Sequence, residues 1–330
     1  MKLIKTLTLV ILLVGITLGQ QKLAQTGFKF LQMPTDGKIS ALAGAVTALE
    51  GNSSAVFGNP ASMARIENSF DANFGNVRYI ADINYYYGVI AYTPERGSYG
   101  VFALSTVFVD YGEMYRTIPD PTNIYFPYKD LGTFKPYGIA VGLSYAKALS
   151  DKFSIGGNLK YAKMDYGEAT INVVNGQNVN KKFTANTFVF DFGMLYHTGF
   201  QSLDFAASFK NFSPDIQVER ESFQAPLCLT IGLAYNLADL FELKKDEHSL
   251  QMSLDFSKPR DYKEQVNVGL DYTFAKMISL RLGYSAPNDE HWFTYGLGIN
   301  YNGIGINYSY VPWKNKAFTD VQQISVNIAF

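Results

Sequence analysis

Large and small residues alternate at two-residue intervals through long parts of this chain. In residues 137–146, Tyr137, Ile139, Val141, Leu143 and Tyr145 stand between Gly, Ala and Ser. Successive side chains of a β-strand point to opposite faces, so such a segment has one large apolar face and one small or polar face. The alternation is typical of a barrel wall with lipid outside and a packed lumen inside.

This pattern and its weaker repeats predict about fourteen antiparallel strands, an even number as in single-chain bacterial barrels. The predicted strands lie near residues 70–79, 83–93, 98–109, 137–149, 152–164, 187–197, 203–210, 227–236, 250–256, 266–274, 278–284, 293–301, 304–310 and 321–330. The predicted fold is an all-β transmembrane antiparallel β-barrel with an N-terminal plug-like segment.

Connection lengths support the same fold, because outer-membrane barrels alternate short periplasmic turns with longer external loops. Predicted external loops lie at 111–134, 166–182, 213–225, 257–263, 286–291 and 312–320, and turns at 94–97, 150–151, 199–202, 275–276 and 302–303. Two connections depart from the rule: 81–82 is short for an external loop, and 238–247 is long for a turn.

The first residues predict export. Lys2 and Lys5 precede an apolar run at 7–18, and Gly19 is a small residue before a cleavage point. No later run of about 18 apolar residues predicts a membrane-spanning helix, so a membrane-integral form must be a barrel. We therefore expect a signal peptide at 1–19, a plug-like periplasmic segment at 20–68 and an outer-membrane barrel at 69–330.

Composition limits the partners. Aromatic residues reach 15% and charged residues only 17%, with 25 Phe and 23 Tyr, which suits strands bordered by aromatic belts. The net charge of -1 provides no basic surface for nucleic acid. Cys228 has no second thiol with which to form an internal disulfide.

The last predicted strand needs a partner. Ile324, Val326, Ile328 and Phe330 share one apolar face, and an unpaired strand of this kind would be an exposed edge. We expect it to pair with the first strand and close the ring. The final Phe330 is similar to the terminal aromatic residue that the insertion machinery reads in outer-membrane barrels, which implies a role in assembly.

The segment before the barrel has a different character. Residues 39–50 are rich in Ala and Leu and predict a short helix, which Gly51 ends. Three short motifs follow one another there: Phe30-Leu31, then residues 40–45 (SALAGA), then Asn59-Pro60-Ala61.

In this order and spacing the motifs resemble the PorV and PorQ family and, more distantly, the FadL-type long-chain fatty-acid transporters. The chain has Ala43-Gly44 where the family has Gly-Gly, and Ala-Ser-Met after Pro60 in place of Ala-Gly-Leu. The resemblance implies that the segment folds into the periplasmic mouth of the barrel and is seated by Asn59, Pro60 and Ala61. The alternative is an ordinary Asn-Pro loop.

No chemistry-bearing motif stands out. Lumen-facing residues such as Lys160, Asp191, Asp255, Asp271 and Arg281 are expected to form structural ion pairs. The three histidines lie in separate hairpins without ligand spacing, so we expect no metal, no cofactor and no catalytic residue. The GxG pairs at 296–298 and 303–305 are expected to relieve crowding in the lumen, and Tyr85, Tyr86 and Tyr87 to belong to a membrane-interface belt.

The long loop at 111–134 is apolar for a segment that faces water. Its apolar residues either pack over the barrel mouth as a lid or bind a partner. They are Met114, Tyr115, Ile118, Ile124, Tyr125, Phe126 and Tyr128.

The resemblance implies a function without catalysis. Proteins of the PorV and PorQ group hold or relay secreted cargo in type IX secretion and partner with translocon or attachment components. The alternatives are a FadL-like transporter of hydrophobic small molecules and a simple porin. A polar interior favours a protein-binding role over transport of hydrophobic molecules, and a plug-like segment argues against an open porin. Further expected partners are outer-membrane lipid and a lipid or detergent-like ligand in the barrel.

Overall fold

The computed structural model describes residues 26–330 except 121–123, 175–176, 240–243 and 245–246. The predicted signal peptide at 1–19 therefore lies outside the described residues. In the described part of the chain, no helix is long and apolar enough to cross a membrane.

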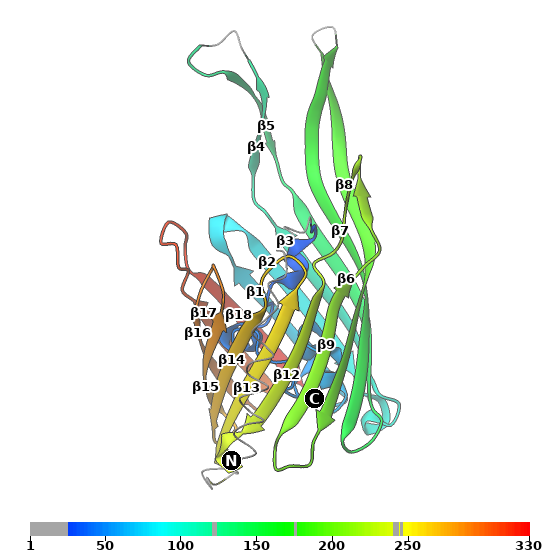
Figure 1. The fold of residues 1–330 in the computed structure, drawn as a ribbon, viewed down its shortest axis with the longest axis vertical. Coiled ribbons are helices and arrows are strands. Elements are labelled where there is room, and N and C mark those ends of the chain that lie inside the picture. Colours follow the sequence, from blue (N-terminus) through cyan, green and yellow to red (C-terminus); the bar gives the residue numbers. More distant parts are fainter. Residues whose placement is uncertain (1–25, 121–123, 175–176, 240–243, 245–246) are drawn as a thin grey trace, which may run out of the picture.

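Fourteen antiparallel strands close into a barrel (Figure 1), which confirms the predicted fold class. In chain order they are β1 (Phe70–Arg78), β2 (Asn84–Tyr92), β3 (Val101–Asp110), β6 (Tyr137–Ala148), β7 (Phe153–Val174), β8 (Gln177–His197), β9 (Asp204–Phe212), β12 (Cys228–Asn236), β13 (His248–Pro259), β14 (Gln265–Phe274), β15 (Ile278–Ala286), β16 (Phe293–Tyr301), β17 (Ile304–Val311) and β18 (Val321–Ala329).

The two faces of the wall follow the predicted alternation. In β15, Leu280 and Leu282 are exposed on the outer face, whereas Arg281 and Ser285 are buried on the inner face. Apolar side chains thus meet lipid, and polar side chains meet the lumen, where they find hydrogen-bond partners.

Pairing of β1 with β18 closes the ring. The register runs from Asp71 opposite Ala329 to Arg78 opposite Gln322. Just outside this ladder, Phe70 and Phe330 donate their backbone N–H groups to each other's carbonyl oxygens, both at 2.9 Å. Their rings stack with centroids 5.5 Å apart, so the seam is held at its end as well as along its length.

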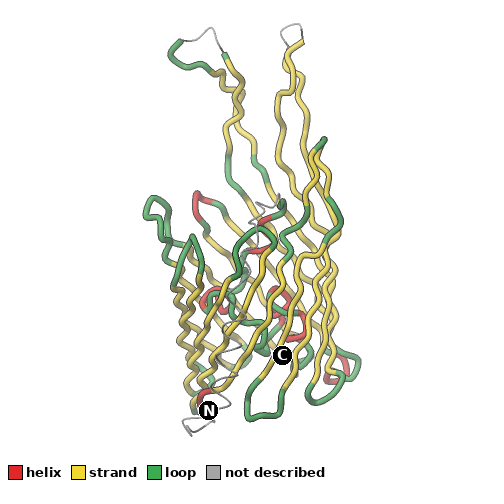
Figure 2. The backbone as a smooth tube through the Cα atoms, in the orientation of Figure 1, coloured by secondary structure: helices red, strands yellow, loops and turns green. Residues whose placement is uncertain are grey.

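Residues 26–68, named here the inner segment, pass through the barrel as short helical turns (Figure 2). These are η1 (Lys29–Gln32), α2 (Gly37–Ala41), η2 (Ser53–Phe57) and η3 (Pro60–Met63). α2 lies against β15 to β18, and η3 lies against β6 to β8. Other short helices occupy connections: η4 (Ile80–Asp82), η5 (Pro94–Gly97) and η6 (Leu237–Asp239).

The resemblance noted in the sequence implied that the inner segment folds into the periplasmic mouth. In the structure it is not confined to that mouth. Gly27 donates its N–H to the carbonyl oxygen of Gln224 at 3.1 Å, and Gln224 belongs to the long connection before β12. The segment therefore begins at the end of the barrel that carries the long loops. It reaches the other end at Glu50, which contacts His197, and at Arg65, which donates to the carbonyl oxygens of Ser150 and Asp151, before it leads into β1.

The predicted helix at 39–50 is wrong over most of its length. α2 ends at Ala41 because Ala43 and Gly44 have positive φ angles of 52° and 78°. The N–H groups of Val46 and Thr47 then donate to Asp255 Oδ2, each at 3.1 Å, in place of helical carbonyl groups. Hydrogen bonds to the Asp255 carboxylate of the barrel wall thus outweigh the helix propensity of residues 42–50.

Three segments predicted as loops contain strands. Strands β4 (Met114–Pro119) and β5 (Tyr128–Phe134) form one separate two-stranded sheet. Strands β10 (Ile216–Val218) and β11 (Glu221–Phe223) form another. The β7–β8 hairpin continues through most of 166–182. β4, β5 and the extension of β7 and β8 stand beyond the barrel (Figure 1), where both faces meet water, and β10 and β11 span only three residues each. None of these segments therefore has the long apolar alternation of the wall.

Candidate functional site

Two long hairpins project from the barrel at the end that carries the long loops (Figure 1). The first arm is β4 and β5 with their connecting loop, residues 114–134. The second arm is the extension of β7 and β8 from residue 166 to residue 182. Their lengths set them apart from the turns at the opposite end.

The first arm carries the seven apolar residues singled out in the sequence, and it exposes nearly all of them. Tyr115, Ile124 and Tyr125 are 75%, 91% and 89% exposed, and Ile118 is half-buried. Met114, Phe126 and Tyr128 are also exposed, with the rings of Phe126 and Tyr128 in a T-shaped contact at 6.4 Å. The arm stands away from the barrel opening, so these residues do not form a lid in this conformation.

The two arms touch at their bases. The Phe134 ring occupies the space beside Gly167, whose φ of +85° and close approach to that ring leave no room for a Cβ. Arg116 donates from Nη2 to the carbonyl oxygen of Leu131 at 3.1 Å, and its Nη1 lies 3.7 Å from Glu168 Oε2. These contacts hold the base of the first arm against the second arm.

The β10–β11 hairpin supports the second arm from its other side. Ile216 is buried, and Lys181 of β8 pairs with Glu219 between β10 and β11. The second arm is therefore braced by its neighbours on both sides.

The Asn59-Pro60-Ala61 motif is a buried turn against the wall. Asn59 is 1% exposed; its Nδ2 donates to the carbonyl oxygens of Thr47 (2.8 Å) and Met194 (3.2 Å), and its Oδ1 accepts from the N–H of Ala61 (3.0 Å). The turn rests on Gly156 and Gly193, which face each other across β7 and β8. A Cβ at Gly193 would overlap Asn59 Oδ1, and one at Gly156 would come within 2.5 Å of the Pro60 carbonyl carbon. Sequence reasoning found the motif and missed these two glycines, whose only signal was a small residue at an inward position.

Buried carboxylates join the rest of the inner segment to the wall. Asp36 caps α2 through Oδ1, and its Oδ2 accepts from Asn73 Nδ2 (3.0 Å) and the Tyr87 hydroxyl (3.2 Å). Tyr85 and Tyr87 are buried in the lumen, so the predicted interface belt is wrong for these two, whereas Tyr86 is exposed on the outer face. The GxG glycines behave as predicted in one clear case: a Cβ at Gly296 would overlap the Ala41 side chain.

Four of the five lumen charges expected to form ion pairs do so, whereas Asp255 instead accepts hydrogen bonds from Val46 and Thr47 of the inner segment. Lys160 Nζ lies 2.8 Å from Asp191 Oδ2 and donates to Asn211 Oδ1 at 2.7 Å, and Arg281 Nε lies 3.2 Å from Asp271 Oδ2. His197 lies between Asp204 (2.7 Å) and Glu50 (3.1 Å) near the periplasmic turns. Across residues 26–330 apart from the undescribed gaps, no group of His, Cys, Asp and Glu is arranged to hold a metal ion.

A cavity of about 710 Å³ remains between the inner segment and the wall. Its lining mixes apolar residues, such as Phe57 and Tyr111, with Lys210 and Asn211. At the loop end it meets Glu290 and His291, where burial raises the pKa of the Glu290 carboxyl and lowers the pKa of His291 to about 4. The cavity therefore has a charged lining at the height of the external loops.

Comparison with known structures confirms the type of barrel. The chain is similar to the Ralstonia pickettii toluene transporter TbuX, at 12% identity and a TM-score of 0.57 over 91% of this chain and 100% of that one. It is similar to the CymD monoaromatic hydrocarbon channel at 11% identity and a TM-score of 0.59, over 90% of this chain and 97% of that one. It is also similar to a Pseudomonas aeruginosa FadL homologue at 14% identity and a TM-score of 0.57, over 90% of this chain and 99% of that one. At these identities the likeness concerns the fold, that of an outer-membrane barrel. No curated protein matches the chain.

A family model gives the more specific match. Residues 124–322 match the type IX secretion system membrane protein PorP/SprF. The match begins at the tip of the first arm and covers more than half of the chain, from β5 through β17 and into the first two residues of β18. It agrees with the type IX system and outer-membrane location expected from the sequence, while the PorV and PorQ branch is not confirmed. The chain belongs to the PorP/SprF family of type IX secretion system membrane proteins.

Proposed function

We propose that this outer-membrane barrel binds polypeptide partners of type IX secretion, either secreted cargo or translocon components, through its external arms, and that it catalyses no reaction. The observation that carries the proposal is the exposed apolar tip of the first arm, formed by Ile124, Tyr125 and Phe126. Solvent-exposed aromatic and aliphatic residues gathered on one protrusion are typical of a protein-binding surface.

The architecture of the arm suits an extended polypeptide. Among the described residues, β4 and β5 pair only with each other, so each presents one free strand edge. A free edge offers backbone N–H and C=O groups to a further strand, and apolar side chains on the faces add affinity and selectivity. The contacts of Arg116 and Phe134 at the base reduce the freedom that binding would have to remove.

Within type IX secretion, we further propose the cargo-holding or relay role of the PorV and PorQ group that the N-terminal motifs resemble. In this reading the inner segment is a plug, and the barrel acts as a membrane-anchored receptor. The buried bonds of Asn59 and Asp36 to the wall support a segment that stays in place.

A second candidate function is passage of hydrophobic small molecules. It is favoured by the lumen cavity of about 710 Å³ and by the fold shared with channels for toluene and other monoaromatic hydrocarbons. It is disfavoured by the ion pairs and hydrogen-bonded carboxylates around that cavity, because an apolar solute would leave them without water.

The test is a triple variant at the arm tip, Ile124→Ser, Tyr125→Ser and Phe126→Ser, in cells whose own copy of the protein is deleted. Secretion of type IX cargo and co-purification of translocon components should fall at least about tenfold, the loss expected from truncating one or two hot-spot residues. The matched control, Tyr99→Ser with Phe200→Ser, removes exposed aromatic residues from the periplasmic turns and should leave secretion intact.

The amount of folded barrel is measured in parallel by heat-modifiable electrophoretic mobility. Normal secretion by the folded tip variant would contradict the proposal. Uptake of toluene by vesicles that contain the wild-type barrel, together with normal secretion by the tip variant, would support the transporter reading.

A further inference from the structure

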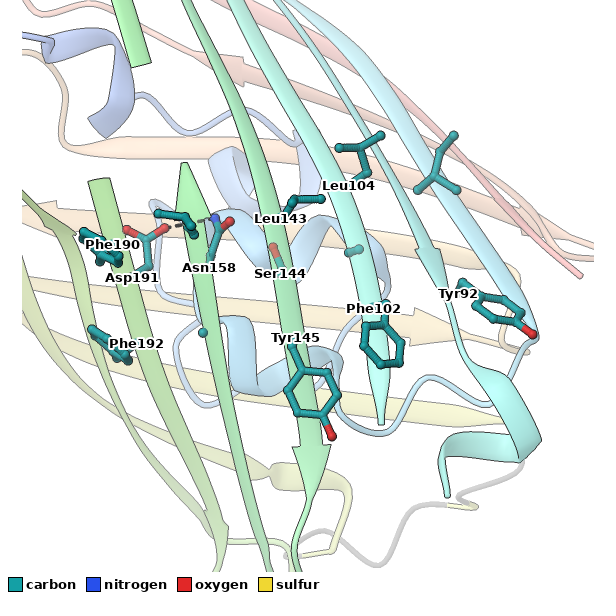
Figure 3. Close-up of a pocket in the computed structure, with 14 residues that line it drawn as sticks. Tyr92, Phe102, Leu104, Leu143, Ser144, Tyr145, Asn158, Phe190, Asp191 and Phe192 are labelled. Carbon is teal, nitrogen blue, oxygen red and sulfur yellow. Dashed lines mark hydrogen bonds between the residues drawn. The ribbon is translucent and has the colours of Figure 1, made fainter. Parts of the chain in front are cut away.

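The outer face of the barrel wall is hollowed between β3 and β8. Figure 3 shows the aromatic rings of Phe102, Tyr145 and Phe192 around this groove, which has a volume of about 650 Å³. Its origin is Gly157 in β7, which stands at an outward position between Ile155 and Leu159. Gly157 lies opposite Tyr145 of β6 and Phe192 of β8, so the groove floor between these two rings is bare backbone.

The groove is lined by hydrocarbon. Outward side chains of β2, β3, β6, β7 and β8 border it, including Leu104, Leu143 and Leu159, and Leu143 is 65% exposed. The rings of Phe102 and Tyr145 lie 5.0 Å apart and form one wall. An apolar hollow in a membrane-facing wall loses dispersion contacts unless a flexible chain fills it, so an acyl chain is the matching occupant.

The polar side chains behind the groove, those of Ser144, Asn158 and Asp191, stand at inward positions of their strands and face the lumen. Asn158 Nδ2 donates to Asp191 Oδ2 at 3.1 Å, and the same carboxylate accepts from Lys160 and from the N–H of Asn211. These partners come from the lumen side. A ligand in the groove therefore needs no polar group at this depth.

One end of the groove reaches the periplasmic interface, where the chemistry changes. The Tyr145 hydroxyl donates to the carbonyl oxygen of Tyr99 at 3.0 Å, in the connection between η5 and β3. Lys147 is the next outward residue of β6, and no described residue forms an ion pair with it. The β2–β3 turn carries Glu95 and Arg96, and the β6–β7 turn carries Asp151 and Lys152. The charges within each turn cancel, so Lys147 is the excess positive charge beside this end of the groove.

We propose that this groove binds one anionic phospholipid of the periplasmic leaflet, with an acyl chain over Gly157 and the phosphate at Lys147. A hydrocarbon slot that ends at an ammonium group matches an amphiphile with an apolar tail and a negatively charged head. The site is on the outer wall, separate from the arms and from the lumen cavity.

Gly157 also makes the proposal testable without damage to the barrel. A Cβ at this position would meet only ordinary contacts, 3.6 Å from the Asp191 carbonyl oxygen and 4.0 Å from Phe192 Cδ1. A leucine side chain at position 157 would therefore extend into the groove and fill it. Ala207→Leu in β9 is the matched control, because it adds bulk at an outward, half-buried position opposite Ile231 and outside the groove.

The experiment uses the full-length barrel, delipidated in detergent and then supplied with phosphatidylglycerol or phosphatidylethanolamine. Native mass spectrometry counts the retained phospholipids, and heat-modifiable mobility confirms that each variant is folded. Wild type and Ala207→Leu should retain one more phosphatidylglycerol than Gly157→Leu. Lys147→Gln should weaken phosphatidylglycerol retention about fivefold, the effect of one lysine at an anionic lipid surface, and should leave phosphatidylethanolamine retention unchanged.

Two results would overturn the site. Equal retention by wild type and Gly157→Leu would show that the groove holds no lipid, and equal losses in Gly157→Leu and Ala207→Leu would show general surface binding. If Lys147→Gln retained phosphatidylglycerol as wild type does, the assignment of the headgroup to Lys147 would be wrong.

Discussion

At the scale of single residues, small side chains decide where the inner segment can touch the wall. Gly156 and Gly193 face each other on neighbouring strands, and the Asn59-Pro60 turn occupies the space their missing Cβ atoms leave. Gly157 is adjacent in sequence to Gly156 but points outward and shapes the lipid-facing groove instead. Neighbouring glycines therefore serve opposite faces of one strand, as the two-residue period of a strand requires.

We predict that Gly193→Ala destabilises the barrel and Gly157→Ala does not. The first substitution displaces the Asn59 amide and its buried hydrogen bonds, with an expected loss of about 2 kcal/mol in the free energy of unfolding. The second should stay within about 0.5 kcal/mol of wild type, because its Cβ meets ordinary contacts. Urea unfolding in phospholipid vesicles measures both, and equal losses would contradict the proposed seat of the turn.

A second residue-scale prediction concerns pH and His291. Its folded-state pKa of about 4 lies below the ordinary value, so the stability gained by keeping it neutral is complete above about pH 6.5 and is lost as pH falls. Glu290 acts in the opposite sense, because its pKa is raised and its contribution is lost as pH rises. His291→Asn should therefore reduce the loss of stability between about pH 7 and pH 5 by about 2 kcal/mol. Parallel pH profiles for wild type and variant, measured by urea unfolding, would refute this assignment.

At the scale of elements, the arms are hairpins held at the base and exposed at the tip. Sequence reasoning placed an apolar external loop at 111–134 and identified its exposed residues, but it did not predict β4, β5 or the extension of β7 and β8. In these segments both faces meet water, so the alternation that marks wall strands is absent. The positive φ of Gly167, which admits the Phe134 ring, depends on a contact between two separate loops and leaves no local pattern.

The base contact gives a prediction for dynamics. Phe134→Ala should loosen the first arm and increase deuterium uptake across β4 and β5 severalfold, because it removes the ring packed beside Gly167. Ile124→Ala at the exposed tip is the matched control and should leave that uptake unchanged, because Ile124 is 91% exposed. Unchanged exchange in Phe134→Ala would mean that the arm is held by other contacts.

At the scale of the whole molecule, the fourteen-strand closed ring followed directly from the sequence. Alternation, hairpin spacing and the need to pair the last strand all describe local and neighbouring contacts. The path of the inner segment did not follow, because Gly27 meets Gln224 and Thr47 meets Asp255 across about two hundred residues of chain. The branch within type IX secretion was inferred from motifs in this segment, whereas the family match lies in residues 124–322.

Closure of the ring has its own test. Phe330→Ala removes the ring stacked on Phe70 at the end of the seam and should lower stability by about 1 kcal/mol. The temperature at which the folded electrophoretic band is lost should fall, whereas Phe200→Ala in a periplasmic turn should not change it. An unchanged temperature for Phe330→Ala would show that backbone pairing of β1 and β18 closes the barrel without help from these rings. A role of Phe330 in membrane insertion remains a prediction, which the yield of folded barrel in the same cells would test.

The most direct test of the proposed function is photocrosslinking in living cells that carry out type IX secretion. A photoreactive phenylalanine analogue replaces Tyr125 at the tip of the first arm, or Tyr295 on the lipid-facing wall as the control. We predict that position 125 crosslinks to type IX cargo or translocon polypeptides and that position 295 does not. No polypeptide crosslink at position 125, in cells that secrete cargo normally, would contradict it.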